Sequence, residues 1–105
     1  MVAHVVMYKF DHNFEKMKNI AKAKDMIEAL PSKMEWIDTL HVGVDFDRGR
    51  GAYDLCIYIT FLTRERLSWF KSESAYLEVA SFLKEVTSES HFVDFVQEED
   101  SCTIS

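Results

Sequence analysis

The strongest constraint on the fold is an alternation of apolar and polar side chains along two segments that a short loop separates. In residues 37–46 every second side chain from Leu40 onward is apolar, and residues 52–62 repeat the pattern. A period of two is typical of β-strands whose two faces meet different surroundings. The connecting sequence DRGRG (47–51) is rich in turn residues, and its glycines are expected to supply positive φ angles. The two segments are therefore predicted to form a β-hairpin.

The segments before the hairpin predict a strand and a helix. Residues 2–10 are rich in β-branched and aromatic side chains, which favours a first strand. From Phe14 to Leu30, apolar residues recur at steps of three and four, which predicts an amphipathic helix with Asn13 as its cap. Pro31 follows, where a helix is expected to end.

The segments after the hairpin predict two helices and a final strand. A short helix begins at Thr63, and after the polar sequence at 72–74 a second helix continues to Val86. Residues 91–96 predict the last strand. The order β-α-β-β-α-β is that of an α+β, ferredoxin-like fold. We expect an antiparallel sheet of order 4-1-3-2 with both helical regions on one face, in one domain (1–97) followed by a polar tail (98–105).

The sheet face that no helix covers is predicted to be apolar. Its expected residues include Val5, Met7, Tyr58, Val93 and Phe95. Such a face is too apolar to remain in water. Two copies that pair these faces about a twofold axis would bury them, so a homodimer through sheet faces is predicted.

Composition argues against several classes of protein. The net charge of −6 and the lack of a basic cluster disfavour nucleic-acid binding. No stretch approaches the roughly 18 apolar residues of a membrane span. Only two cysteines occur, Cys56 and Cys102, so we expect no disulfide framework and a cytoplasmic location. Three glycines leave no phosphate or dinucleotide loop, and the histidines lack metal-ligand spacing, so no cofactor and no metal centre are expected.

The charged residues around the hairpin loop leave alternatives open. Asp45, Asp47 and Asp54 could hold a hard cation loosely, although a solvated turn is the favoured interpretation. Arg48 and Arg50 could meet an anion or the partner subunit.

Three stretches of the chain resemble the stress-responsive α/β-barrel (Dabb) family. They are HVVMYKF (4–10), DRGRGAYDLCIYITF (47–61) and FVDF (92–95), and the resemblance extends over about residues 2–96. It implies that two ferredoxin-like protomers join their sheets into a dimeric α+β barrel. Most members have no established biochemical role. One relative, olivetolic acid cyclase, closes a polyketide ring without a cofactor.

The resemblance to the cyclase implies a pocket between the sheet and the helices, but with altered chemical groups. The cyclase uses a His and a Tyr there. Tyr76 stands at the position of that His, and Phe70 stands at the position of that Tyr. Both working groups of the cyclase are therefore replaced in this chain.

His4 is the remaining candidate for chemistry. A histidine buried in a strand must be hydrogen-bonded, and in the order 4-1-3-2 the last strand runs antiparallel beside the first, which brings Asp94 near His4. The resemblance places both on the pocket side. The carboxylate is expected to fix the imidazole tautomer and raise its pKa.

Two roles for this pair remain open. It is either a structural tie between the first and last strands or a general base and ligand anchor, with Tyr76 as the second candidate catalytic group. A pocket of about 300 Å³ or more beside His4 favours the second role. The expected ligand-binding residues are Val6, Tyr8, Ile57, Ile59, Phe70 and Phe92.

Three functions follow as hypotheses. The first is a dimeric protein that binds a small apolar or aromatic ligand. The alternative is a cofactor-independent, cyclase-like enzyme that transfers protons through His4, Asp94 and Tyr76. A third, by fold analogy alone, is a relative of cofactor-free quinol-type monooxygenases.

Overall fold

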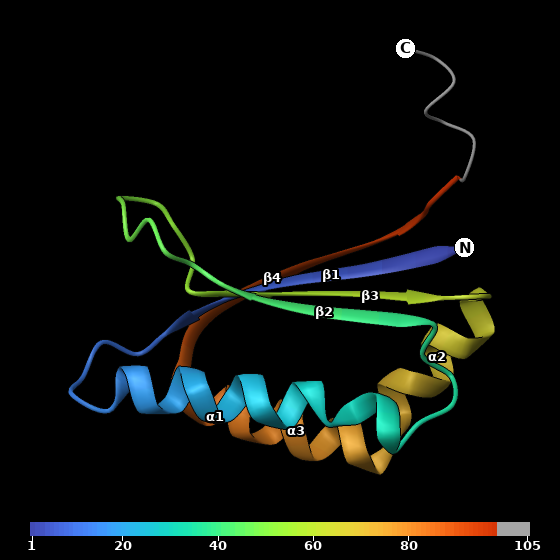
Figure 1. Cartoon of the computed structure of the whole chain (residues 1–105), viewed down its shortest axis with the longest axis horizontal. Coiled ribbons are helices and arrows are strands. Elements are labelled where there is room, and N and C mark those ends of the chain that lie inside the picture. Colours follow the sequence, from blue (N-terminus) through green and yellow to red (C-terminus); the bar gives the residue numbers. More distant parts are fainter. Residues whose placement is uncertain (99–105) are drawn as a thin grey trace.

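The strands and helices follow one another in the predicted order. The computed structural model describes residues 1–98. Its elements are β1 (Val2–Phe10), α1 (Lys16–Glu28), the 3₁₀ turn η1 (Leu30–Ser32), β2 (Thr39–Val44), β3 (Leu55–Phe61), α2 (Arg64–Ser72), α3 (Ser74–Val86) and β4 (Thr87–Val96). The antiparallel sheet has the order β2-β3-β1-β4, and the helices lie together on one face of it (Figure 1). The predicted ferredoxin-like fold and strand order are confirmed.

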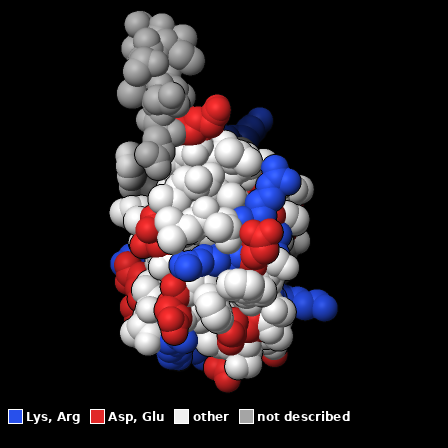
Figure 2. All heavy atoms as spheres, turned by 90° about the vertical axis from the view of Figure 1, so that its right-hand side faces the viewer, with Lys and Arg blue, Asp and Glu red and all other residues white. Residues whose placement is uncertain are grey.

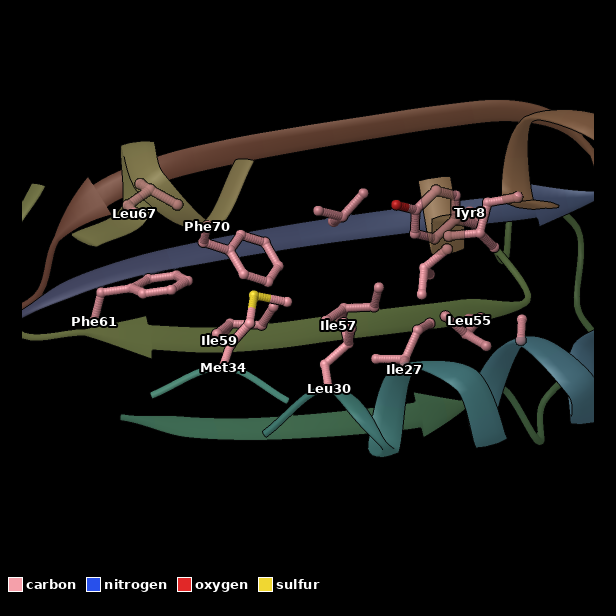
Figure 3. Close-up of a cluster of buried hydrophobic side chains, with 14 of the residues drawn as sticks. Tyr8, Ile27, Leu30, Met34, Leu55, Ile57, Ile59, Phe61, Leu67 and Phe70 are labelled. Atoms are coloured by element: carbon pink, nitrogen blue, oxygen red, sulfur yellow. The ribbon is translucent and has the colours of Figure 1, made fainter. Parts of the chain in front are cut away.

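The core lies between the sheet and the helices. On β1 the side chains of Val6, Tyr8 and Phe10 face the helices and are buried. Apolar side chains of β3, α1 and α2 meet them, as Figure 3 shows for Ile57 and Phe70. Alternation along the strands therefore selects one face of the sheet as the core face.

The first helix begins later than predicted. Asn13 is not its cap: the Asn13 side-chain oxygen accepts a hydrogen bond from the backbone N–H of Glu15 at 2.9 Å, which forms a turn before the helix. Phe14 lies in this turn and is fully exposed, so its predicted place on the apolar face is wrong. The residues that α1 buries are Ile20, Ala23 and Ile27.

The strand bounds differ from the predictions in both directions. β4 begins at Thr87 instead of residue 91, because it pairs with β1 along its whole length although most of its side chains are exposed. Such an edge strand carries no apolar alternation at its start. β2 and β3 are shorter than predicted, and Phe46 lies beyond β2 with its side chain 94% exposed.

The hairpin loop uses its glycines differently from the prediction. Gly51 has a φ of +88°, as expected, but Gly49 does not have a positive φ. Arg48 instead adopts a φ of +55°, the left-handed region that side chains other than glycine rarely occupy. Only Gly51 therefore needs the conformational freedom of glycine.

The uncovered face of the sheet is apolar and exposed in the single chain. Met7 is 43% exposed, Val93 52% and Phe95 41%, and all three lie on the face opposite the helices. The predicted polar tail, with Cys102, lies outside the described residues apart from Glu98. No helix within residues 1–98 is long and apolar enough to cross a membrane.

Candidate functional site

The predicted pairing of His4 with Asp94 is present. The two residues are direct cross-strand partners of β1 and β4. The Nδ1 atom of His4 is hydrogen-bonded to Oδ1 of Asp94, and His4 is only 4% exposed. Sheet register alone places this pair, because both side chains point to the helix-covered face.

Lys71 completes the site, and the sequence analysis missed it. This residue lies in the last turn of α2, and its Nζ donates to Oδ2 of Asp94 at 2.5 Å. Asp94 therefore bridges an imidazole and an ammonium group with its two oxygens. Helical periodicity gives no sign of this contact, because it depends on how the end of α2 is oriented over β4.

Two aromatic rings enclose His4. The centroid of the Phe70 ring lies 6.3 Å from that of His4, edge-on, and the Phe92 ring lies at 5.9 Å. The Lys71 ammonium group sits 5.0 Å from the centre of the Phe92 ring, a cation–π distance. His4 is thus held in apolar surroundings with one polar partner.

The surroundings of His4 lower its pKa, which corrects the expected rise. Burial is the largest cause and disfavours the charged ring. The hydrogen bond and charge of Asp94 act in the opposite direction but do not outweigh burial, and Lys71 adds a further lowering. The sequence analysis considered the carboxylate alone and therefore reached the wrong sign.

The second ring nitrogen of His4 has no hydrogen-bond partner in the part of the chain that the structure describes. With Asp94 ionised, Nδ1 carries the hydrogen that Oδ1 accepts, which leaves a lone pair on Nε2. Nε2 is buried and lacks a hydrogen-bond partner among residues 1–98. A buried polar atom without a hydrogen-bond partner is uncommon in folded proteins, so Nε2 is a candidate for a chemical role.

Asp94 remains ionised beside this ring. Burial acts to raise its pKa, but the hydrogen bonds and positive charges of Lys71 and His4 together outweigh burial and lower it. The carboxylate therefore stays available to fix the His4 tautomer.

Two tyrosines lie next to the histidine. Burial raises the pKa of Tyr8, and the neighbouring Tyr76 hydroxyl raises it further. Burial also raises the pKa of Tyr76, although the hydrogen bond with Tyr8 acts in the opposite direction. The ring of Tyr76 packs against Phe70 with centroids 4.4 Å apart. Both phenols stay protonated near neutral pH and can donate hydrogen bonds.

A cavity of about 230 Å³ opens at these side chains. It is lined by His4, Val6, Tyr8, Lys71, Tyr76, Ser90 and Phe92. Alone it is smaller than the 300 Å³ expected of a small-molecule pocket. A second cavity of about 420 Å³ between α3 and β4 shares Tyr8, Tyr76 and Ser90 with it. The space beside His4 therefore adjoins a larger groove.

The candidate ligand-binding residues separate into two groups. Val6, Tyr8 and Phe92 line the cavity. Ile57, Ile59 and Phe70 are at most 3% exposed in the core and are not among its lining residues. Within residues 1–98, no three His, Cys, Asp or Glu side chains gather as a metal ion requires.

The surface charges near this site are mixed. Figure 2 views the end of the molecule where α2 lies, and acidic and basic side chains are interspersed there. No broad surface of one sign is visible on this face.

Comparison with known protein families shows which family the chain belongs to. Residues 2–97 match the family described as the stress responsive A/B barrel domain, Dabb. The chain belongs to this family. Among curated proteins, none matches it significantly.

Solved structures share the fold at low sequence identity. A dimeric protein of unknown function with a ferredoxin-like fold from Bacteroides fragilis is 23% identical, with a TM-score of 0.84, and the match covers 91% of this chain and 95% of that one. A Dabb family protein from Mesorhizobium loti is 12% identical, with a TM-score of 0.70 and coverages of 93% and 97%.

The structural neighbours include proteins named as enzymes. The hydroxynitrile lyase of Passiflora edulis is 16% identical, with a TM-score of 0.81, and the match covers 93% of this chain and 94% of the lyase. At such identities the likeness establishes the fold and no residue role.

Proposed function

We propose that this Dabb protein binds a small apolar or aromatic ligand in the cavity beside His4, with a polar ligand atom at His4 Nε2. The observation that carries the proposal is the buried Nε2 atom, which has no hydrogen-bond partner among the described residues and belongs to a residue that lines a cavity. A hydroxyl or amide N–H group of a ligand would satisfy this nitrogen by donating a hydrogen bond to it. Phe92 and Val6 would contact the apolar part of the ligand.

The ligand is best sought by its effect on stability. A ligand that binds only the folded state raises Tm with concentration. The wild type is screened by thermal shift against small aromatic and polyketide-like compounds, and every hit is repeated with His4→Gln. Glutamine keeps a polar side chain but has no imidazole, so the shift is expected to disappear.

His12→Gln is the matched control, since His12 is exposed and lies outside this cavity. The Tm of His12→Gln should rise with each ligand as the Tm of the wild type does. Hits that stabilise the His4→Gln variant fully would place ligand binding elsewhere and contradict the proposal.

A second candidate function is proton transfer on a bound carbonyl compound. The observation that favours it is the set of groups beside one cavity: Asp94 orients His4, and the hydroxyls of Tyr8 and Tyr76 are hydrogen-bonded to each other, which leaves one hydroxyl hydrogen for a ligand. A neutral His4 can accept a proton from carbon while a phenol donates to the carbonyl oxygen. The hydroxynitrile lyase neighbour supports the idea only in that an enzyme occupies this fold.

Isotope exchange distinguishes catalysed proton transfer from ligand binding without catalysis. Ligands found by thermal shift are incubated in D₂O with the protein, and deuterium uptake at carbon next to a carbonyl is followed by NMR. Catalysis predicts uptake that Tyr76→Phe slows and His4→Gln abolishes. Equal uptake with and without protein would leave ligand binding as the only activity.

We also propose that two copies pair through the uncovered sheet faces to form a dimeric barrel. The exposed apolar side chains Met7, Val93 and Phe95 support this, as do neighbours described as dimeric. The scarcity of cysteines supports a cytoplasmic location, and the family match over 2–97 supports one domain with a short tail.

A further inference from the structure

A further cavity, separate from the two described above, lies at the opposite end of β1 from His4. It has a volume of about 450 Å³ and is formed by the start of α1, the end of β1 and the loop between β2 and β3. This is the end of the molecule that Figure 1 shows at the left. Its lining includes five basic side chains: Lys9, His12, Lys16, Arg48 and Arg50. None of these residues belongs to the His4 site.

The carboxylates of this cavity neutralise only part of its positive charge. Asp54 pairs with Lys16 at 3.2 Å and also accepts the backbone N–H of Phe10 at 2.7 Å. Asp45 accepts the backbone N–H of Arg48 at 2.7 Å. Within residues 1–98, neither Arg48 nor Arg50 forms an ion pair with a carboxylate, and the same holds for Lys9.

This distribution is unusual for the molecule. The chain carries a net charge of −6, yet four of its 12 Lys and Arg residues line this one cavity against two carboxylates. Unpaired cations close together repel one another. An anion bound among them would relieve this repulsion.

The loop conformation holds one arginine against the helix. Arg48 has its backbone in the left-handed region, fixed by the hydrogen bond to Asp45. Its guanidinium Nη1 lies 3.7 Å from Sδ of Met17 on α1, and both residues line the cavity. A strained residue of this kind persists where the surrounding structure fixes it, and such residues cluster at ligand sites.

We propose that this cavity binds the phosphate group of a small organic molecule. Two guanidinium groups match the geometry of phosphate oxygens, and the lysines add point charges. The volume accommodates a small molecule. A long polyanion such as a nucleic acid is disfavoured, because the rest of this acidic protein repels it.

Inorganic phosphate is the first probe. The purified protein is titrated at constant ionic strength while backbone amide shifts are recorded by NMR, with acetate as the second anion. Phosphate is expected to shift the amides of Gly49, Gly51 and Lys16 in a saturable way and to bind more tightly than acetate. The double variant Arg48→Gln, Arg50→Gln should bind phosphate at least about tenfold more weakly, as the loss of charged hydrogen bonds implies.

The matched control removes the same charge elsewhere. Arg64→Gln with Arg66→Gln changes two arginines of α2, which lie outside this cavity. It should bind phosphate as the wild type does, and both double variants should keep the wild-type spectrum outside the changed region. Equal weakening in the two double variants would show general charge screening and overturn the proposal. Acetate binding as tight as phosphate, or no saturable shift at the loop amides, would also overturn it.

Discussion

The two faces of β1 carry similar side chains but meet different surroundings. On the helix-covered face, Val6 is 5% exposed and Tyr8 7%, because α2, α3 and the rest of the core cover them. On the other face, Met7 between them is 43% exposed. One strand therefore supplies both a completed core and an apolar surface that the single chain leaves open. The comparison teaches that apolar alternation fixes the fold on one face and calls for a partner on the other.

The largest effect is expected from charged substitutions on the uncovered face of the sheet, called the open face below. Met7→Asp together with Phe95→Asp would bury an unpaired charge on each side of the proposed interface, at several kilocalories per mole. We expect monomers or aggregates in sedimentation analysis, where the wild type should have about twice the 12.3 kDa of one chain.

The control for this variant changes exposed apolar residues elsewhere. Phe14→Asp with Leu77→Asp alters side chains that are 100% and 51% exposed on the helical side. This pair should leave the dimer intact. A wild-type mass near a single chain would contradict the open-face interpretation.

Substitutions of His4 and Asp94 test how much their contact on the helix-covered face contributes to stability. His4→Ala removes a buried ring between Phe70 and Phe92 and leaves Asp94 with one partner fewer, so the free energy of unfolding should fall by about 1–3 kcal/mol. Asp94→Asn should lower it less, because the amide oxygen still accepts from the imidazole. Urea denaturation measures both, with the exposed His12→Ala as the control. If His4→Ala unfolds at the same urea concentration as His12→Ala, the pair does not tie the strands together.

The stability of the covered face should also depend on pH. Because the pKa of His4 is lower in the folded state than the ordinary value of 6.5, the unfolded chain binds more protons there. The free energy of unfolding should therefore decrease as pH falls from about 6.5 toward the folded-state pKa. His4→Gln should remove this part of the pH dependence. A dependence that is unchanged in His4→Gln would assign it to another group.

The smallest effect is expected in the hairpin loop, which lies outside both faces. Gly51 has a φ of +88°, so Gly51→Val should lower the free energy of unfolding by about 1 kcal/mol. At Gly49 an added Cβ would meet only the end of the Asp47 side chain, which can rotate away. Gly49→Val should therefore have a smaller effect in thermal denaturation. The reverse order of the two variants would contradict the loop conformation.

The sequence predicts what depends on local alternation and misses what depends on packing. The bounds of β1 follow from its β-branched and aromatic content, and the strand order follows from the order of the elements. The contact between His4 and Asp94 follows from alternation along the strands and from antiparallel register. The participation of Lys71 does not, because the orientation of α2 over the sheet has no sequence signature. The sign of the His4 pKa shift was also missed, since desolvation depends on the rings of Phe70 and Phe92 closing around the imidazole.

The measurement that tests the central claim most directly is an NMR pH titration of the His4 ring. In the proposed site the His4 ring is neutral, its Nδ1 donates a hydrogen bond to Asp94, and its Nε2 accepts a hydrogen bond from a ligand. This arrangement predicts a pKa below 6.5, a hydrogen on Nδ1 at neutral pH, and a further lowering in Asp94→Asn, where the carboxylate charge is lost. A pKa at or above 6.5, or a hydrogen on Nε2 with no change in Asp94→Asn, would contradict it.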